Sequence, residues 1–485
     1  MEKLFLINIE TEITMEQASV FFKRVMLGLL LAVLALTLAL VVREGLTSRS
    51  YLLALILGAA WAAGLYALLR KCPTPVPPHA GLMAALLCFA VNLVWVLVIR
   101  IEPFSDYKEY WDVACALAGG TEIPDAWYVA MYPHILGTAT ILSALARVFG
   151  ESVFAVTVMN VVLTSVSCYL LWLLGKRLLS ERGAFLAALL WAVTPCKLML
   201  SSLVFSEPIY TLLILLFFLL FLRLDRRIKE KPLPALCLAA GMGLLLEAIN
   251  LVRPIALILV IAAALWIVFL RGGEMKSGRL WALWFAAFLA MTAVFRVSGG
   301  LWDRHVENVL GQEIASVPWY NIYVGFNEET GGRYTDADMD LLTGYLKQGM
   351  SANEAQKSMI PHIKERLASG INFPKLLGTK LFSFLGADQL GGYTYRFTRS
   401  ERFVKICMGV CNVFYYGVFL AGLAGLVRMF RSRALGAGLL LPLFFLGLTL
   451  AHMLVEVADR YHYSLIPILI IFAALGFAGE ERSQL

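Results

Sequence analysis

The chain has 485 residues, of which 60% are hydrophobic and only 15% are charged, and its mean hydropathy is +0.76. Soluble domains are about half apolar, so this composition excludes a soluble protein and predicts an all-α polytopic membrane protein. The formal net charge of +7 does not indicate nucleic-acid binding, because Lys and Arg concentrate at the ends of apolar segments, where membrane orientation accounts for them.

The amino-terminal residues do not resemble a cleaved signal peptide, because several acids precede the first apolar run. Lys23 and Arg24 lie directly before that run, which is typical of a retained signal anchor. The eight cysteines and six histidines show neither a metal-binding spacing nor an HExxH motif. We therefore expect no disulfide framework and no zinc site.

Roughly twelve apolar runs are long enough to cross a bilayer as helices. Their continuous apolarity excludes a transmembrane β-barrel, whose strands alternate apolar and polar residues. The predicted spans are 25–42, 51–69, 80–99, 153–174, 183–203, 207–224, 233–250, 254–270, 280–296, 403–427, 434–455 and 461–478.

The charge of the connections predicts the orientation. If the amino terminus is cytoplasmic, every inside connection is basic, as the positive-inside rule requires. These connections are 70–71, 176–182, 223–231, 271–279 and 428–433. Residues 132–149 are also apolar, but a crossing there would turn four later basic connections outward. We therefore expect this segment to lie in the outer interface without crossing.

Two long polar regions are expected on the outer side, a first loop at 100–152 and an insert at 297–402. Within the insert, Thr335 and Ser351 each begin a capping-box pattern and predict the start of a helix. The predicted organisation is an amino-terminal segment with two added spans (1–79), a transmembrane core that includes the first outer loop (80–296), the extracytoplasmic helical insert (297–402), and carboxyl-terminal spans (403–485).

The stretch from Arg100 to Asp112 is the first strongly polar part of the chain. It interleaves acids with aromatic residues directly after an apolar run, which is typical of a membrane surface. Asp106 stands where it could cap the following helix or act as a base. Glu109 is either part of the water-facing side of that helix or a supporting acid.

Charged residues in or beside spans are costly unless they face a cavity or a partner, so each is a candidate functional residue. The candidates at outer turns are Lys197, Glu207, Glu247, Arg253, His452, Glu456, Asp459 and Arg460. Structural alternatives stay open: an ion pair of Lys197 with Glu207, interface anchoring by Arg253, a helix-end ion pair among Glu456, Asp459 and Arg460, and simple packing for His134 and His452.

Short motifs in a fixed order resemble the GT-C membrane glycosyltransferases, above all the protein O-mannosyltransferases and the bacterial aminoarabinose transferases. The resemblance covers most of the chain from about residue 80. It implies a GT-C-like bundle and an inverting enzyme that takes a hexose or pentose from a polyprenyl-phosphate donor. The motifs are 103–107, 132–133, 175–177, 206–210, 253–254 and 456–461, with Pro467 in the final helix.

The resemblance also implies roles for the candidates. Asp106 would be the catalytic base, and Arg253, with Lys197 and Arg460, would bind the donor phosphate. The supporting acids or acceptor-binding residues would be Glu109, Glu207, Glu456, Asp459 and His134. No obligatory metal is expected, although a divalent metal stays open because such enzymes vary in this respect.

The expected partners are membrane lipids, the lipid-linked donor and a glycan, lipid or protein acceptor, with the active site on the extracytoplasmic side of a bacterial plasma membrane. Tyr107 stands where protein O-mannosyltransferases have Glu, which argues against a protein acceptor. Two other functions stay open: a polymerase or ligase for lipid-linked glycans with a lipid-diphosphate donor, and a transporter or flippase. Transporters show repeated halves and midplane charges, and neither pattern is visible in this sequence.

Overall fold

The computed structural model describes residues 2–71, 75–271 and 277–478, with side chains from residue 15 onward. The regular elements in this part of the chain are all helices, which confirms the predicted all-α class. Ten helices are long and apolar enough to cross a membrane, or up to eleven if one bent pair forms a single span. The side chains of most of the acidic amino terminus, before residue 15, and part of the basic connection 271–279 lie outside the described residues.

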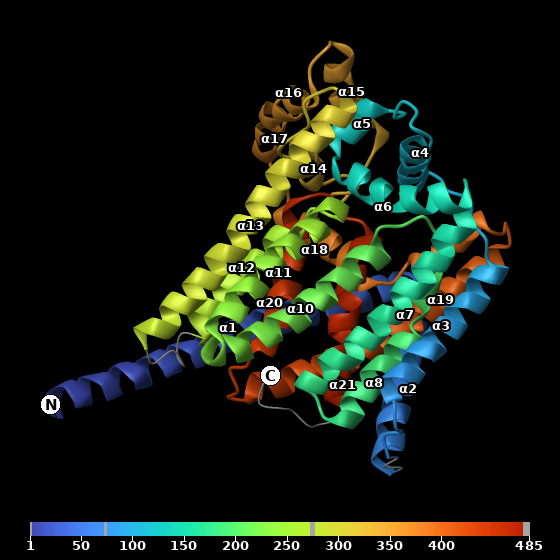
Figure 1. Ribbon diagram of the computed structural model, residues 1–485. Helices are drawn as coiled ribbons and strands as arrows, with labels where there is room; N and C mark the ends of the chain where they lie inside the picture. The colour runs from blue at the N-terminus through green and yellow to red at the C-terminus, as the bar shows by residue number, and fades with distance from the viewer. Residues whose placement is uncertain (1, 72–74, 272–276, 479–485) are drawn as a thin grey trace.

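The helices that could span a membrane form the body of the molecule (Figure 1). They are α1 (Glu2–Thr47), α2 (Arg49–Lys71), α3 (Ala80–Val98), α7 (Val153–Leu178), α10 (Glu207–Glu230), α11 (Pro232–Val252), α13 (Gly278–Leu310), α19 (Glu401–Arg431), η5 (Ala437–Leu439) with α20 (Leu440–Leu454), and η6 (Asp459–Leu465) with α21 (Ile466–Ala478).

The remaining helices are shorter, and many gather at one end of the bundle, where Figure 1 shows α4 to α6 and α14 to α17 together. They are α4 (Asp106–Gly119), α5 (Ala126–Met131), α6 (His134–Phe149), α14 (Trp319–Gly325), α15 (Asp336–Lys347), α16 (Ala352–Lys357), α17 (Met359–Ala368), α18 (Phe373–Leu381), η3 (Phe382–Gly386) and η4 (Leu390–Arg396).

Two of the predicted spans are not long continuous helices. The span predicted at 183–203 is α8 (Glu181–Ala192) followed by α9 (Pro195–Ser201), with a bend of 48° between them. Pro195 explains the break, because proline has no N–H to continue a helix. The span predicted at 254–270 is α12 (Ala256–Leu265), which continues as the π-helix η1 (Trp266–Arg271) and is among the shorter apolar helices. The described residues thus hold ten or eleven candidate spans, against roughly twelve predicted.

The lengths of two further helices, α6 and α13, can be compared with the predicted spans. α6 is 16 residues long and counts among the shorter apolar helices, and the expectation that residues 132–149 do not cross stays a prediction. α13 is longer than its predicted span 280–296 and runs to Leu310. Gly243 of α11 faces α13, where a Cβ atom would overlap the Met291 carbonyl oxygen, so glycine lets the two helices pack this closely.

The predicted capping patterns of the insert are confirmed. Thr335 caps α15 by accepting a hydrogen bond from the Asp338 N–H. Ser351 and Glu354 form a complete capping box at the start of α16. Because these patterns involve only neighbouring residues, they can be recognised without knowing the fold.

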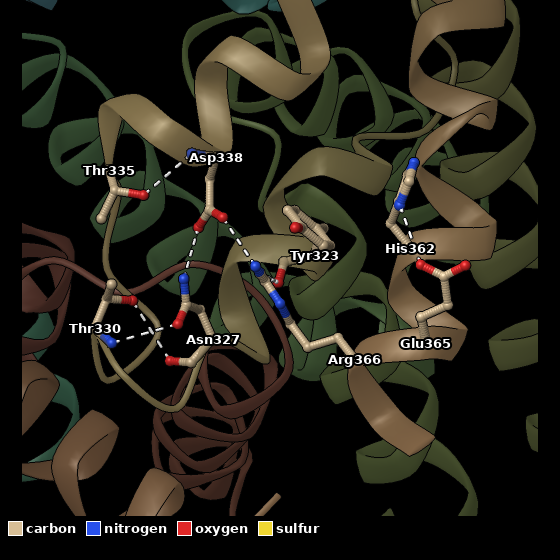
Figure 2. A network of polar contacts seen from close by, with 8 residues as sticks. All are labelled: Tyr323, Asn327, Thr330, Thr335, Asp338, His362, Glu365 and Arg366. Carbon is tan, nitrogen blue, oxygen red and sulfur yellow. Dashed lines mark hydrogen bonds and ion pairs between the residues drawn. The ribbon is translucent and has the colours of Figure 1, made fainter. Parts of the chain in front are cut away.

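Figure 2 shows the polar network that fixes the insert. The Arg366 guanidinium bonds the buried Asp338 carboxylate at 2.9 Å and lies 3.5 Å from the ring centroid of Tyr323. Asn327 donates to the other carboxylate oxygen of Asp338 at 2.9 Å. A charged group bonded on both sides in this way is costly to disrupt, so the network holds α14, α15 and α17 in one arrangement.

Candidate functional site

α4 begins at Asp106, and its carboxylate meets a cation from the far end of the chain. Arg460 Nη2 donates to Asp106 Oδ2 at 2.6 Å, and Arg460 Nη1 donates to the Tyr107 hydroxyl at 2.9 Å. The Tyr107 hydroxyl in turn donates to the Tyr393 hydroxyl at 3.0 Å. The N-cap position belongs to Ser105, so Asp106 is not the helix cap, and its carboxylate pairs with Arg460.

The backbone before Asp106 is strained. Ser105 has φ of 48° and ψ of −139°, outside the regions that residues with a side chain prefer. Such a conformation costs on the order of 1–3 kcal/mol and persists only where surrounding contacts impose it. The bonds of Asp106 and Tyr107 to Arg460 supply those contacts, so the strain lies next to the proposed base.

Arg253 lies beside this pair and contacts it through an aromatic ring. Its guanidinium carbon is 4.3 Å from the ring centroid of Tyr461, and that of Arg460 is 5.3 Å from the same centroid. Arg253 is the C-cap residue of α11, and Pro254 then prevents the helix from continuing. Among the described residues, no hydrogen-bond acceptor pairs with the Arg253 side chain. Its N–H donors are therefore available to a ligand.

Glu207 is buried at the start of α10, close to both arginines. Its Oε2 atom accepts a hydrogen bond from the Ser206 hydroxyl at 3.3 Å, and its charge interacts with those of Arg253 and Arg460. Its Oε1 atom has no hydrogen-bond partner among the described residues. A buried carboxylate that is only partly satisfied is costly unless it orients cations or binds a ligand.

His134 and Glu109 line the same region from the first outer loop. Burial, with the charge of Arg253 second, lowers the pKa of His134 to about 3, so its imidazole is neutral near pH 7. The His134 ring centroid lies 6.4 Å from that of Tyr110. Burial, with Asp125 next, raises the pKa of Glu109. The two residues therefore add polarity to this region without adding a positive charge.

The insert holds the segment that carries Glu456 and Arg460. The Glu456 N–H donates to the Asn321 carbonyl at 2.7 Å, and the Val457 N–H donates to the Gly332 carbonyl at 3.0 Å. The Tyr461 hydroxyl donates to Glu456 Oε1 at 3.3 Å. Burial raises the pKa of the Glu456 carboxyl, against the lowering effect of Arg460.

Lys380 of α18 adds a third connection. Its buried ammonium donates to the carbonyls of Gly325 and Val455, each at 2.8 Å. Gly325 must be glycine, because a Cβ atom there would overlap the Leu454 carbonyl oxygen. Burial lowers the pKa of Lys380 to about 7, although Glu456 acts in the opposite direction. Lys380 therefore joins the end of α14 to the segment that leads to Arg460.

Two predicted site residues lie elsewhere. Lys197 is fully buried, its electrostatic neighbours are the thiols of Cys88, Cys168 and Cys196, and its ammonium has no hydrogen-bond partner among the described residues. The predicted alternative of a Lys197 ion pair with Glu207 is absent from the same part of the chain. The charge of Asp459 acts on Tyr51, Asp388 and His462. Neither Lys197 nor Asp459 contacts the Asp106–Arg460 pair.

Several residues of the site escaped sequence reasoning. Tyr393 of η4 lies 286 residues after Tyr107, and no pattern in one sequence predicts that these two hydroxyls meet. Tyr461 contacts both arginines, yet a tyrosine at a membrane interface is too common to single out. Among the described residues, no group of three or more His, Cys, Asp and Glu could hold a metal.

Comparisons with known proteins give one family match. Residues 134–297 match the model of a family described as dolichyl-phosphate-mannose-protein mannosyltransferase, which confirms the predicted resemblance over these residues. The matched part contains Arg253 and Glu207 and does not extend to Asp106 or Arg460. A search of curated proteins found no significant match.

Six chains of solved structures also match. One is the archaeal oligosaccharyltransferase AglB from Archaeoglobus fulgidus, solved in complex with an inhibitory peptide and a dolichol-phosphate, with 12% sequence identity and a TM-score of 0.43. The alignment covers 81% of this chain and 50% of the archaeal chain, so this chain spans about half the length of that protein.

Proposed function

We propose that this multi-pass membrane protein is an inverting glycosyltransferase that moves a sugar from a polyprenyl phosphate to a hydroxyl acceptor on the extracytoplasmic face. The observation that supports it best is the Arg253 side chain, whose donors are unused by the described residues and which lies next to the Asp106–Arg460 pair. A carboxylate and an available guanidinium side by side are what this transfer needs.

The reaction is a direct displacement at the anomeric carbon. The acceptor hydroxyl oxygen forms the new bond to that carbon while its proton passes to Asp106. The bond between the anomeric carbon and the phosphate oxygen breaks, and the electron pair leaves with the polyprenyl phosphate. Asp106 Oδ2 is occupied by Arg460, so Oδ1 is the oxygen that faces the acceptor.

Arg253 stabilises the leaving phosphate. A guanidinium matches phosphate oxygens with two parallel N–H donors, and its charge offsets the negative charge that grows on the leaving group. The Tyr461 ring orients Arg253 by a cation–π contact at 4.3 Å. Arg460 orients Asp106 and Tyr107 and adds positive potential to the same space.

Two glutamates near these cations balance their positive charge. Glu207 and Glu456 both interact electrostatically with Arg253 and Arg460 and keep the site from carrying an excess of positive charge before the donor arrives. The Oε1 atom of Glu207 has no partner among the described residues, so it is also a candidate acceptor for a sugar hydroxyl. Glu109 and His134 are the candidate acceptor-binding residues from the first outer loop.

The test is a transfer assay with the purified full-length chain. It is offered polyprenyl-phosphate hexoses and pentoses, with polyprenyl-diphosphate sugars in parallel, and the released lipid and the product configuration are measured. Release of polyprenyl monophosphate with inversion at the anomeric carbon supports the proposal. Turnover of diphosphate donors alone would overturn it in favour of a glycan polymerase or ligase.

A further inference from the structure

A second polar cavity lies away from the Asp106–Arg460 pair, between the carboxyl end of α1 and the insert. Its volume is about 380 Å³, and parts of α1, α18, η3 and the loop between α14 and α15 surround it. The lining residues are Arg43, Glu44, Thr330, Arg333, Thr379, Phe382 and Ser383. We call this space the α1 cavity.

The α1 cavity offers several donors suited to an anion. Arg333 donates to the Ser383 hydroxyl from Nε at 3.2 Å and from Nη2 at 2.9 Å, which fixes the plane of its guanidinium. Its Nη1 atom makes no bond to the described residues and remains available. Ser383 itself is only 3% exposed, so this anchor lies inside the fold.

The charge of the lining is positive. Arg43 is bonded to Glu44 through Nε at 3.1 Å and Nη2 at 2.6 Å, so Glu44 neutralises one of the two arginines and leaves a net charge of one. Thr330, Thr379 and Ser383, each with a hydroxyl group, also line the α1 cavity. Guanidinium and hydroxyl groups together suit a phosphate, which has several acceptor oxygens in a compact group.

The position of the α1 cavity favours a lipid over a free ion. Arg43 lies in the last turns of α1, at the end of a helix that is long and apolar enough to cross the membrane. Leu29, Leu36 and Arg43 follow one another at seven-residue spacing, which is nearly two helical turns, so they share one face. Leu29 is 54% and Leu36 is 53% exposed, so that face is open for an apolar chain.

We propose that the α1 cavity binds the phosphate of a membrane lipid headgroup, with the lipid chain lying along the Leu29 and Leu36 face of α1. The headgroup contacts are Arg333 and Arg43 with the three hydroxyls. This site is separate from the proposed transfer site, and α1 lies before the residues that match the mannosyltransferase family. The inference therefore holds or fails independently of the proposed reaction.

One side chain connects the two regions. The charges of Arg333, Glu44 and Asp459 all act on Tyr51, and the Gln389 amide donates to its hydroxyl at 3.3 Å. Asp459 immediately precedes Arg460, which holds Asp106. Tyr51 is therefore within electrostatic range of both the α1 cavity and residue 459, next to Arg460.

The experiment is lipid binding to the purified full-length chain, followed by native mass spectrometry with dioleoyl phosphatidic acid as the probe. The wild-type chain should retain phosphatidic acid, and Arg333→Gln should weaken its binding about tenfold or more, because a charge-assisted guanidinium–phosphate contact is lost. Arg399→Gln is the matched control, since Arg399 is exposed and outside the cavity lining. It should bind as the wild type does.

A second variant and a competition experiment test whether the α1 cavity binds a lipid phosphate. Arg43→Gln should also weaken binding, and because its side chain is 64% exposed, this variant keeps the test valid if Arg333→Gln misfolds. Inorganic phosphate at the same concentration as the lipid should not compete. Equal lipid retention by both arginine variants and the wild type would overturn the site, and full displacement by inorganic phosphate would overturn the lipid assignment.

Discussion

Arg253 and Lys197 are both cations beside outer turns, yet the structure gives them opposite surroundings. Arg253 contacts Tyr461 beside the Asp106–Arg460 pair, and its donors are available. Lys197 is enclosed by helices with three thiols as its electrostatic neighbours. A charge near the membrane therefore marks a site only where counter-groups and space for a ligand accompany it.

The largest effect is expected for Asp106→Asn. An amide keeps the size of the side chain but cannot accept the acceptor's proton, so turnover should fall by about 10²–10⁴-fold. Donor binding should stay close to that of the wild type, as measured by titration with a polyprenyl phosphate. Asp112→Asn is the control, because among the described residues Asp112 pairs only with the exposed Lys108. Wild-type turnover in Asp106→Asn would remove Asp106 as the base.

The main effect expected for Arg253→Ala is weaker binding of the donor. Loss of a charge-assisted contact to phosphate costs on the order of 1.5–3 kcal/mol, which corresponds to roughly 10–150-fold weaker donor binding. Equilibrium binding of a polyprenyl phosphate measures it, with Arg304→Ala as an exposed control on α13. Unchanged affinity in Arg253→Ala would show that Arg253 only anchors the helix end.

Lys380→Met tests whether the insert positions the site. The substitution leaves the Gly325 and Val455 carbonyls without a donor, at a cost on the order of 1–3 kcal/mol. We expect a melting temperature lower by several degrees and turnover reduced about tenfold, because the segment of Arg460 loosens. Lys375→Met, which removes only the exposed pair with Glu328, should change neither quantity. Full turnover with lower stability would limit Lys380 to a structural role.

His134 should make the protein less stable in acid. Its pKa is lowered to about 3 in the folded chain, so below its ordinary pKa of about 6.5 the unfolded chain binds more protons. Stability from this residue is therefore complete above about pH 6.5 and declines as the pH falls toward 3. Thermal melts of the wild type and His134→Gln between pH 7 and 5 measure it. If the melting temperatures of the two proteins fall equally between pH 7 and pH 5, the lowered pKa of His134 is contradicted.

Lys197→Met should have the smallest effect on function. A buried ammonium without a hydrogen-bond partner costs desolvation energy, so methionine should leave the melting temperature equal or higher. Turnover and donor affinity should match the wild type. A selective loss of donor affinity in this variant would place Lys197 in the donor site and undo the comparison with Arg253.

Local patterns in the sequence predicted much of the fold. The apolar runs placed the spanning helices, and the Thr335 and Ser351 patterns placed two helix starts, because both signals involve neighbouring residues. The bend at Pro195 and the extension of α13 to Leu310 were not predicted. A bent helix and a straight one have similar hydropathy, so composition cannot separate them.

The site was predictable in its charges and not in its contacts. The rarity of charges at outer turns led to Arg253 and Arg460, and the polar stretch 100–112 led to Asp106. The structure brings these three together. The same reasoning selected Lys197, because rarity carries no information about neighbours. Lys380 lies in the insert and was not singled out, because its bonds reach residues 55 and 75 positions away. Such contacts depend on the tertiary fold.

The most direct measurement compares binding and turnover on the same preparations of the wild type, Asp106→Asn and Arg253→Ala. A polyprenyl phosphate is titrated for binding, and a polyprenyl-phosphate sugar is supplied for turnover. We predict that Asp106→Asn binds the lipid and fails to transfer, while Arg253→Ala binds it at least about tenfold more weakly. Binding and turnover that remain unchanged in both variants would contradict the proposed division between base and phosphate-binding cation.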